Sequence, residues 1–246
     1  MQKDNFSHDS EAYRTYRPDY PQELFDYLKN LPVGKELMWD VGTGNGQMVK
    51  GMADGFRSIV ATDISAAQLS QAPLFDHVHY SVQAAEQTNF QKGAINLITI
   101  AQAIHWFDFD RFYQEVRRVS ANDAIIAVIG YSRPKLQAEL DQLLDEFYTL
   151  TVGPYWDKER HYIDEGYKTI PFPFTELERP DFSMYYEWHL AHLIGYLSTW
   201  SAVKHYKTQT GKDPLTEFKF KLESVVDPKA VLKVEFPLLL RIGMVN

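Results

Sequence analysis

The residues with the clearest chemical potential stand in a glycine-rich stretch that runs from Asp40 to Gly46. Gly42, Gly44 and Gly46 alternate with other residues there, directly after a short hydrophobic run. Glycines at such a turn let a ligand approach the backbone closely, because side chains would collide with the ligand. Asp40 precedes the first glycine, and its charge would repel a pyrophosphate. The stretch therefore favours a ligand that carries an ammonium and a sulfonium group.

The spacing of these residues argues against two common nucleotide-binding motifs. The dinucleotide motif G-x-G-x-x-G needs a third glycine where Gln47 stands, and a P-loop needs a lysine where Met52 stands. A second acid, Asp63, follows the glycine turn by about 20 residues, where a carboxylate can accept hydrogen bonds from both hydroxyls of a ribose. Together the two acids favour a nucleoside without phosphates. The alternative is that Asp40 and Asp63 only cap the helices that follow them.

Alternating β-rich and helical segments between residues 35 and 130 must position these side chains. Such alternation predicts an α/β fold with a mainly parallel sheet. A helix is expected before the first strand, at 22–29, and others at 48–54, 66–71 and 109–119. The expected strands are 36–41, 58–63, 77–82, 95–101 and 124–130.

Beyond residue 130 the pattern changes to one that is typical of a cap over a site. An amphipathic helix is expected at 136–148, and an irregular stretch rich in aromatic residues and proline at 151–180. A strand at 182–188 precedes a long helix at 190–208 and another helix at 214–226. A terminal strand at 231–244 contains Pro237, which suggests a sheet edge or a bulge.

The amino-acid composition limits the classes of molecule that the protein is expected to bind. The 246 residues include 25 Lys and Arg against 33 Asp and Glu, which gives a net charge of −8. The sequence contains no run of basic residues. Nucleic acid is therefore not expected as a partner. The absence of cysteine excludes disulfides, thiolate ligands and cysteine nucleophiles. The polar first residues and the lack of any run of ~20 apolar residues predict a soluble, cytoplasmic protein without a membrane partner.

Four stretches resemble the class I S-adenosylmethionine-dependent methyltransferases (methyltransferase type 11 domain), in particular the trans-aconitate methyltransferase-like branch. They are Phe6–Ser7 with Tyr13 and Tyr16–Pro21, then Asp40–Gly46, Ala101–Asp108 and Tyr196–Ser201. The resemblance implies a Rossmann-like, seven-stranded, mainly parallel sheet with helices on both faces and a helical, aromatic-rich cap. It also implies S-adenosylmethionine as cofactor, with S-adenosylhomocysteine as its product. The implied division is an N-terminal segment covering the cofactor (1–34), a cofactor-binding core (35–150), cap elements (151–230) and a terminal antiparallel strand (231–246).

The resemblance also assigns roles to individual residues. The glycine turn would hold the methionine part, Asp63 the ribose and Ile64 the adenine, while Gln102 would line the methyl group. One departure from the family is Val119–Asp123, which replaces a Leu-Lys-x-Gly-Gly turn and is interpreted as a rebuilt turn. The complete set of expected cofactor contacts is Tyr13, Arg17, Asp40, Gly42, Thr43, Gly44, Gly46, Gln47, Asp63, Ile64, Ala85, Glu86 and Gln102.

The methyl acceptor would be bound beside this set. His105 is the candidate general base for a hydroxyl or amine acceptor, with a structural histidine as the alternative; a carboxylate acceptor would need no base. Arg160 is a candidate partner for an acceptor carboxylate, unless it is solvated among its charged neighbours in sequence. The expected acceptor-binding residues are Trp106, Trp156, Arg160, Tyr162 and Trp200.

The expected function is methylation of a small molecule, with a carboxylic acid as one acceptor class. A methyltransferase of RNA or protein is the alternative that the charge disfavours, and a cofactor-binding protein without catalysis is another. His189 and His192 lie near Glu187, but without a third ligand at recognisable spacing no metal is expected. The chain is expected to be a monomer or a weak homodimer.

Overall fold

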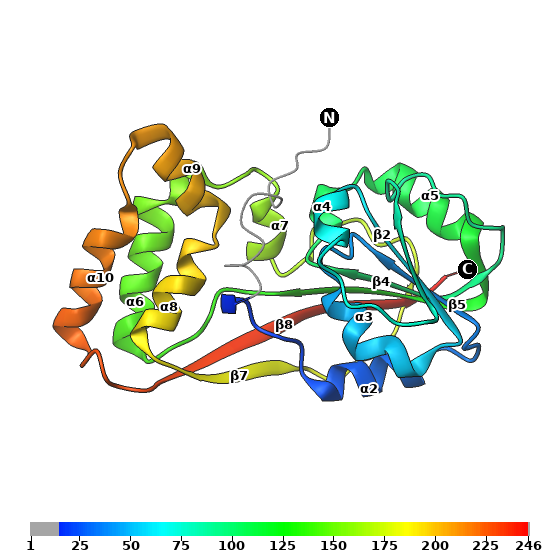
Figure 1. The fold of residues 1–246 in the computed structure, drawn as a ribbon, viewed down its shortest axis with the longest axis horizontal. Helices are drawn as coiled ribbons and strands as arrows, with labels where there is room; N and C mark the ends of the chain where they lie inside the picture. The colour runs from blue at the N-terminus through cyan, green and yellow to red at the C-terminus, as the bar shows by residue number, and fades with distance from the viewer. Residues whose placement is uncertain (1–14, 246) are drawn as a thin grey trace.

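The computed structural model describes residues 15–245. Figure 1 shows an α/β region and a separate group of helices, which are connected by two long strands, β7 (Ser183–Trp188) and β8 (Leu232–Met244). The short helix α7 (Arg160–Asp164) lies between the two groups. Helix α7 belongs to the cap that the sequence predicts, and this arrangement brings it next to the α/β region.

The sheet has the order β3-β2-β1-β4-β5-β8-β6, with β7 also paired to β8. The first five strands are parallel and β8 is antiparallel to β5, so the predicted Rossmann-like fold is confirmed, with eight strands rather than seven. The chain leaves β1 toward β2 and returns to β4 on the other side, which creates a crevice at the carboxyl ends of β1 and β4. The strands other than β7 and β8 are β1 (Leu37–Val41), β2 (Ser58–Asp63), β3 (Val78–Val82), β4 (Ile95–Ala101), β5 (Ser120–Tyr131) and β6 (Thr175–Glu176).

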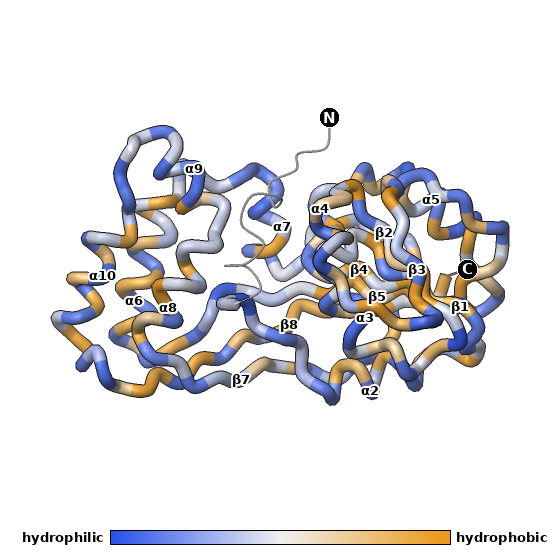
Figure 2. The backbone as a smooth tube through the Cα atoms, in the orientation of Figure 1, coloured by the Kyte–Doolittle hydropathy of each residue, from blue (hydrophilic) through white to orange (hydrophobic). Residues whose placement is uncertain are grey.

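Alternating residues of the strands are buried on opposite faces, each covered by helices. In β5, Ile125 and Ile129 pack in the cluster that includes helices α2 and α3, whereas Ile126 and Val128 pack with α5. Strands β4 and β5 are accordingly hydrophobic along much of their length (Figure 2). The helices of this region are α2 (Gln22–Asn30), α3 (Gln47–Met52), α4 (Ala66–Leu69) and α5 (Phe109–Val119), with single turns η1 (Ala53–Gly55) and η2 (Ile104–Trp106).

The cap differs from the prediction in two places: the stretch 151–180, expected to be irregular, contains α7 and β6, and the helix expected at 190–208 is divided. Residues 190–208 form two helices rather than one, because α8 (Leu190–Ser198) ends before Thr199 and α9 (Ser201–Thr210) begins after Trp200. The Thr199 hydroxyl donates to the carbonyl of Tyr196, and Trp200 takes an extended conformation that buries its ring. The other cap elements are α6 (Ala138–Glu146), the π turn η3 (Phe147–Thr151), η4 (Gly153–Tyr155) and α10 (Pro214–Val225).

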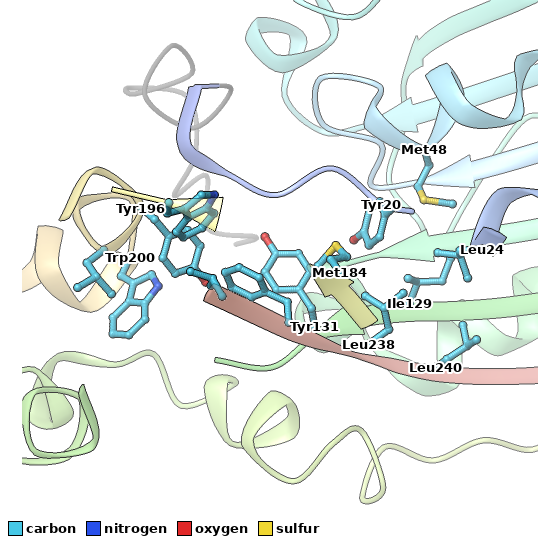
Figure 3. Close-up of a cluster of buried hydrophobic side chains, with 14 of the residues drawn as sticks. Tyr20, Leu24, Met48, Ile129, Tyr131, Met184, Tyr196, Trp200, Leu238 and Leu240 are labelled. Atoms are coloured by element: carbon cyan, nitrogen blue, oxygen red, sulfur yellow. The ribbon is translucent and has the colours of Figure 1, made fainter. Parts of the chain in front are cut away.

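One hydrophobic cluster extends from the cap into the α/β region. Figure 3 shows it running from Tyr196 and Trp200 through Tyr131 and Met184 toward Leu24. Helix α6 packs against α10 in the helical group, although the sequence division placed it at the end of the core. Within residues 15–245, no helix combines the length and apolar character that crossing a membrane requires.

Pro237 in β8 and Asp123 in β5 are two residues that the sequence singled out and that the structure explains. Pro237 stands where β8 passes from its pairing with β7 (residues 232–237) to its pairing with β5 (residues 238–244). The stretch expected as a rebuilt turn instead forms the start of β5, where Asp123 has a φ of 59° and the pairing with β4 shifts. Both residues therefore mark changes in strand pairing.

Candidate functional site

A cavity of about 620 Å³ opens at the carboxyl ends of β1, β2 and β4, in the crevice that the strand order creates. The residues expected to contact the cofactor line this cavity, with the exceptions of Arg17, Gly46 and Tyr13. Arg17 lines a second, smaller cavity, and Gly46 packs against Pro73 on the side of the turn away from the cavity. Tyr13 falls outside the described residues. The expected residues found in the lining are Asp40, Gly42, Thr43, Gly44, Gln47, Asp63, Ile64, Ala85, Glu86 and Gln102.

Asp40 is the buried acid at the base of this cavity. Its Oδ1 accepts a hydrogen bond of 2.6 Å from the Thr99 hydroxyl, and its Oδ2 has no hydrogen-bond partner among residues 15–245. Burial raises the pKa of the Asp40 carboxyl to about 6, because the charged form is poorly solvated there. Asp40 therefore has an acceptor atom available for a cation, and the helix that follows it, α3, begins after Gly46 with no cap from the Asp40 side chain.

Asp63 holds the glycine turn against β2. Its Oδ2 accepts from the backbone N–H of Gly44 at 2.8 Å, and its Oδ1 accepts from Ser65 at 2.9 Å. The second bond resembles the helix-capping role considered from the sequence, since Ser65 precedes α4. Each carboxylate oxygen still has a lone pair for a further donor, so a ribose contact is compatible with both bonds.

The glycines of the turn serve different purposes. A Cβ at Gly42 would lie 2.6 Å from the Cβ of Ala103, and one at Gly46 would lie 2.9 Å from Pro73. At Gly44 the nearest atom would be 3.8 Å away, so the open space there belongs to the cavity. All three have positive φ, which side chains adopt with strain.

The far end of the cavity offers an apolar surface beside hydrogen-bonding groups. Ile64 lines the cavity with 42% of its surface exposed, whereas the isoleucines of the core are buried. The Glu86 carboxylate accepts from the backbone N–H of Asp108 at 3.1 Å, which joins the β3 loop to the start of α5. Arg111 and Glu159 also line the cavity, and no motif in the sequence indicated them.

The segment before α2 is tied to the glycine turn. The Gln47 side-chain amide donates to the carbonyl of Pro18 at 2.9 Å and to the Asp19 carboxylate at 3.1 Å. Tyr20 lines the cavity as a result. Tyr20 belongs to the Tyr-Arg-Pro-Asp-Tyr stretch of the resemblance, which contained the signal that could have nominated it.

A second, smaller cavity of about 70 Å³ adjoins the first, and Gln102 and Trp106 line both. Gln102 has a φ of 55°, a conformation that non-glycine residues adopt rarely and that often occurs at functional sites. Of the expected acceptor residues, all but Tyr162 line the small cavity; Tyr162 packs instead against Phe109. The lining also includes Arg17, His105, Asp157, Ile163, Thr199 and Ser201.

Arg160 is enclosed rather than solvated among its charged neighbours, because its side chain is only 18% exposed. Its guanidinium lies over the ring of Trp156, 4.6 Å from the ring centre, and its Nε donates to the Tyr148 hydroxyl at 2.9 Å. Its two Nη atoms make no hydrogen bond within the described chain. The forked end of Arg160 is therefore available to a ligand of the small cavity.

Two further donors border the small cavity. The indole Nε1 of Trp156 is buried without a hydrogen-bond partner in residues 15–245. Arg17 donates from Nη1 to the Tyr131 hydroxyl at 3.1 Å and lies over the ring of Tyr196. The wall of this cavity has two guanidinium groups and an indole N–H against one carboxylate, that of Asp157, and this balance favours an anionic ligand.

His105 lies buried in the wall of the small cavity, with its Nδ1 3.4 Å from the Tyr167 hydroxyl. Burial and the positive charge of Arg160 lower the pKa of His105 to about 3. The imidazole is therefore neutral at physiological pH. A neutral imidazole whose protonated form is this unfavourable is a poor general base.

The histidines considered as metal ligands are engaged elsewhere. His192 packs on Trp188 with ring centres 4.4 Å apart, and His189 lies 3.4 Å from the carbonyl of Ala230. Across residues 15–245, no three acidic, histidine or cysteine side chains gather in a way that could hold a metal ion.

Comparisons with known proteins agree with this geometry. The methyltransferase domain family matches residues 39–128. A methyltransferase-named protein of Dictyostelium discoideum is 31% identical over 220 residues, which cover 88% of this chain and 84% of that protein. A solved structure described as a type II methyltransferase, from Anaeromyxobacter dehalogenans, is 36% identical with a TM-score of 0.86, and the match covers 94% of this chain and 98% of that one.

The relative from Dictyostelium and the structure from Anaeromyxobacter match nearly the whole chain, cap included. Within the match lies the crevice where Asp40 offers a buried acceptor atom beside an open glycine turn. This chain therefore belongs to the class I S-adenosylmethionine-dependent methyltransferases.

Proposed function

We propose that this enzyme transfers the methyl group of S-adenosylmethionine to a carboxylate oxygen of a small organic acid. The observation that carries the proposal is the enclosed Arg160, whose forked end is available at a small cavity adjoining the cofactor cavity. A guanidinium fork matches a carboxylate in shape and charge. The resemblance of residues 101–108 and 196–201 to the trans-aconitate methyltransferase-like branch supports the same class of acceptor.

The groups that line the large cavity support binding of the cofactor there. Asp40 would accept from the ammonium group, Asp63 from the ribose hydroxyls, and Ile64 would pack on the adenine ring. The open space at Gly44 leaves room for the methionine part. When bound, S-adenosylmethionine supplies an electrophilic methyl group on a sulfonium.

The residues of the small cavity would orient the acceptor and exclude water. Arg160 and the Trp156 N–H would bind one carboxylate oxygen or both, and Arg17 adds a second positive charge. Because a carboxylate is already ionised at neutral pH, no general base is needed. The neutral His105 suits this reaction, because methylation of a carboxylate releases no proton that a base would have to accept.

The proposal is tested by the chemistry of the product. The enzyme would be incubated with methyl-labelled S-adenosylmethionine and a panel of small carboxylic acids, amines and phenols. Carboxyl methyl esters release volatile labelled methanol in mild base, whereas methyl amines and aryl ethers do not. Base-labile product from carboxylic acids alone is expected. Base-stable product from an amine or phenol would refute the carboxylate acceptor while leaving methyl transfer intact.

A further inference from the structure

We propose that Tyr148 is a positioning residue that holds Arg160 in the orientation needed to bind the acceptor anion. Its hydroxyl stands between Arg160 and Asp164 and keeps the carboxylate from occupying the guanidinium fork. The inference rests on the proposed function, and it assigns a specificity role to a residue outside the walls of both cavities.

The hydrogen bonds fix the direction of each donor. The Tyr148 hydroxyl lies 2.6 Å and 2.8 Å from the two carboxylate oxygens of Asp164. A carboxylate only accepts, so the hydroxyl donates to Asp164 and its oxygen accepts from Arg160 Nε at 2.9 Å. Arg160 itself reaches Asp164 only through Nε, at 3.4 Å. The hydroxyl therefore stands between two opposite charges one helical turn apart on α7, which meet directly only at the 3.4 Å contact of Nε.

The backbone around Tyr148 is built to present this hydroxyl. Helix α6 gives way at Phe147 to a π turn, closed by a hydrogen bond of 3.0 Å from Val152 to the carbonyl of Phe147. Such turns rotate the following side chains and occur often at functional sites. The ring of Tyr148 is buried between Trp156 and Trp200, with centres 5.0 Å and 5.6 Å from theirs. The hydroxyl therefore has little freedom to move.

This rigidity has a consequence for binding. A side chain that is held in its bound orientation loses less entropy when the ligand arrives. Without the hydroxyl, Asp164 would be free to accept both Nη donors of Arg160, because the two residues are four apart on α7 and i,i+4 pairs face each other. The fork would then be neutralised by the protein's own carboxylate. Figure 1 places α7 between the two groups of elements, and Arg160 of this helix lines the small cavity.

The experiment measures anion binding to the protein saturated with S-adenosylhomocysteine. Acetate and benzoate are the probes, and the fluorescence of the tryptophans that line the small cavity is the signal. Tyr148→Phe is expected to weaken anion binding about tenfold, the effect of losing a hydrogen bond to a charged group. Its affinity for S-adenosylhomocysteine should not change. Tyr155→Phe is the matched control, because the Tyr155 ring packs on Tyr206 and its hydroxyl makes no hydrogen bond within the described chain.

Asp164→Asn separates positioning from simple packing. In the wild-type background this change should strengthen anion binding a few-fold, because it removes the competing charge. In the Tyr148→Phe background it should restore most of the lost affinity, which a merely structural role of the hydroxyl would not allow. The single Asp164→Asn variant also serves as the test if Tyr148→Phe does not fold.

Each outcome has a defined meaning. Unchanged anion affinity in Tyr148→Phe, weaker binding in Asp164→Asn, or no recovery in the double variant would overturn the positioning role. Wild-type protein that binds S-adenosylhomocysteine but neither anion would overturn both the carboxylate acceptor and this inference. Failure of the wild type to bind S-adenosylhomocysteine would instead refute the cofactor site itself.

Discussion

The two cavities of this enzyme are adjacent but are built in different ways. The large cavity, where we propose that the cofactor binds, is the cofactor cavity; it is lined by the glycine turn and by residues at the carboxyl ends of parallel strands, with Asp40 and Asp63 fixed by bonds to Thr99 and to the glycine turn. The small cavity, where we propose that the acceptor binds, is the acceptor cavity; it is lined by residues of η2, of the segment after η4, of α7 and of the α8–α9 break, together with Arg17 and Gln102. The first depends on local geometry, and the second on how distant segments pack.

This difference predicts how each cavity responds to change. Substitutions in the cofactor cavity should affect the binding of S-adenosylhomocysteine, whereas those in the acceptor cavity should leave it intact. Gln102 and Trp106, which line both, are the exceptions. The following experiments test this separation.

The largest effect is expected from Asp40→Asn. Loss of the charge should weaken S-adenosylhomocysteine binding by about a hundredfold, the usual scale for removing one partner of a buried charge pair. Isothermal titration calorimetry measures the Kd directly. Binding that stays within a few-fold of wild type would contradict the role of Asp40 as the ammonium partner.

The same variant should not be destabilised. The pKa of Asp40 is raised to about 6 from its ordinary value of 3.8, so its charge opposes folding at neutral pH by about 3 kcal/mol. Because the folded-state pKa is the higher one, this penalty is present above pH 6 and disappears as the pH falls toward 4. Asp40→Asn should therefore raise the Tm more at pH 7.5 than at pH 4.5. Thermal unfolding of the variant and the wild type without ligand measures the difference.

Arg160→Leu should damage only the acceptor side. We expect the acceptor KM to rise about tenfold or more, because an enclosed charge-assisted pair is lost. The Kd of S-adenosylhomocysteine should stay unchanged. Arg57→Leu is the control, since Arg57 is exposed and pairs with Glu36 at the surface. An equal change in both constants would contradict the separation of the two cavities.

The cofactor cavity could be predicted largely from the sequence, and physical reasons explain why. A turn of alternating glycines between a strand and a helix has few conformations, and strand order places Asp40 and Asp63 at one edge. Among the lining residues that the sequence did not nominate are Arg111 and Glu159, which come from α5 and from the loop before α7. Their positions depend on packing between elements, for which spacing along the chain contains no signal.

The acceptor cavity could be predicted only in outline. Trp156, Arg160 and Trp200 were found because aromatic residues and a cation were concentrated in the irregular stretch and its neighbour helix. Arg17 was expected at the cofactor, yet it lines the acceptor cavity and reaches the break between α8 and α9 through the Thr199 carbonyl. That break was itself missed, because the burial of Trp200 outweighs the helical pattern of residues 190–208.

A smaller effect is expected from pH. Protonation of Asp40 removes the charge that the ammonium group needs, so affinity for S-adenosylhomocysteine should be constant above pH 7 and fall below pH 6. With a pKa of about 6, the affinity at pH 5 should be about tenfold lower than on the plateau. The ligand keeps its zwitterionic amino acid group over this range. Calorimetry at several pH values tests this, and Asp40→Asn should show a flat profile; a flat wild-type profile would contradict it.

The smallest effect is expected at His105, which contrasts with Asp40. Its pKa is lowered to about 3 by burial and by Arg160, so its ring should remain neutral from pH 5 to pH 8. Nuclear magnetic resonance of the imidazole should show no change in chemical shift over that range. Arg160→Leu should move the pKa upward, because one of the two causes is removed. An inflection near pH 6.5 in the wild type would contradict the burial argument and would return His105 to consideration as a general base, and with it a hydroxyl or amine acceptor.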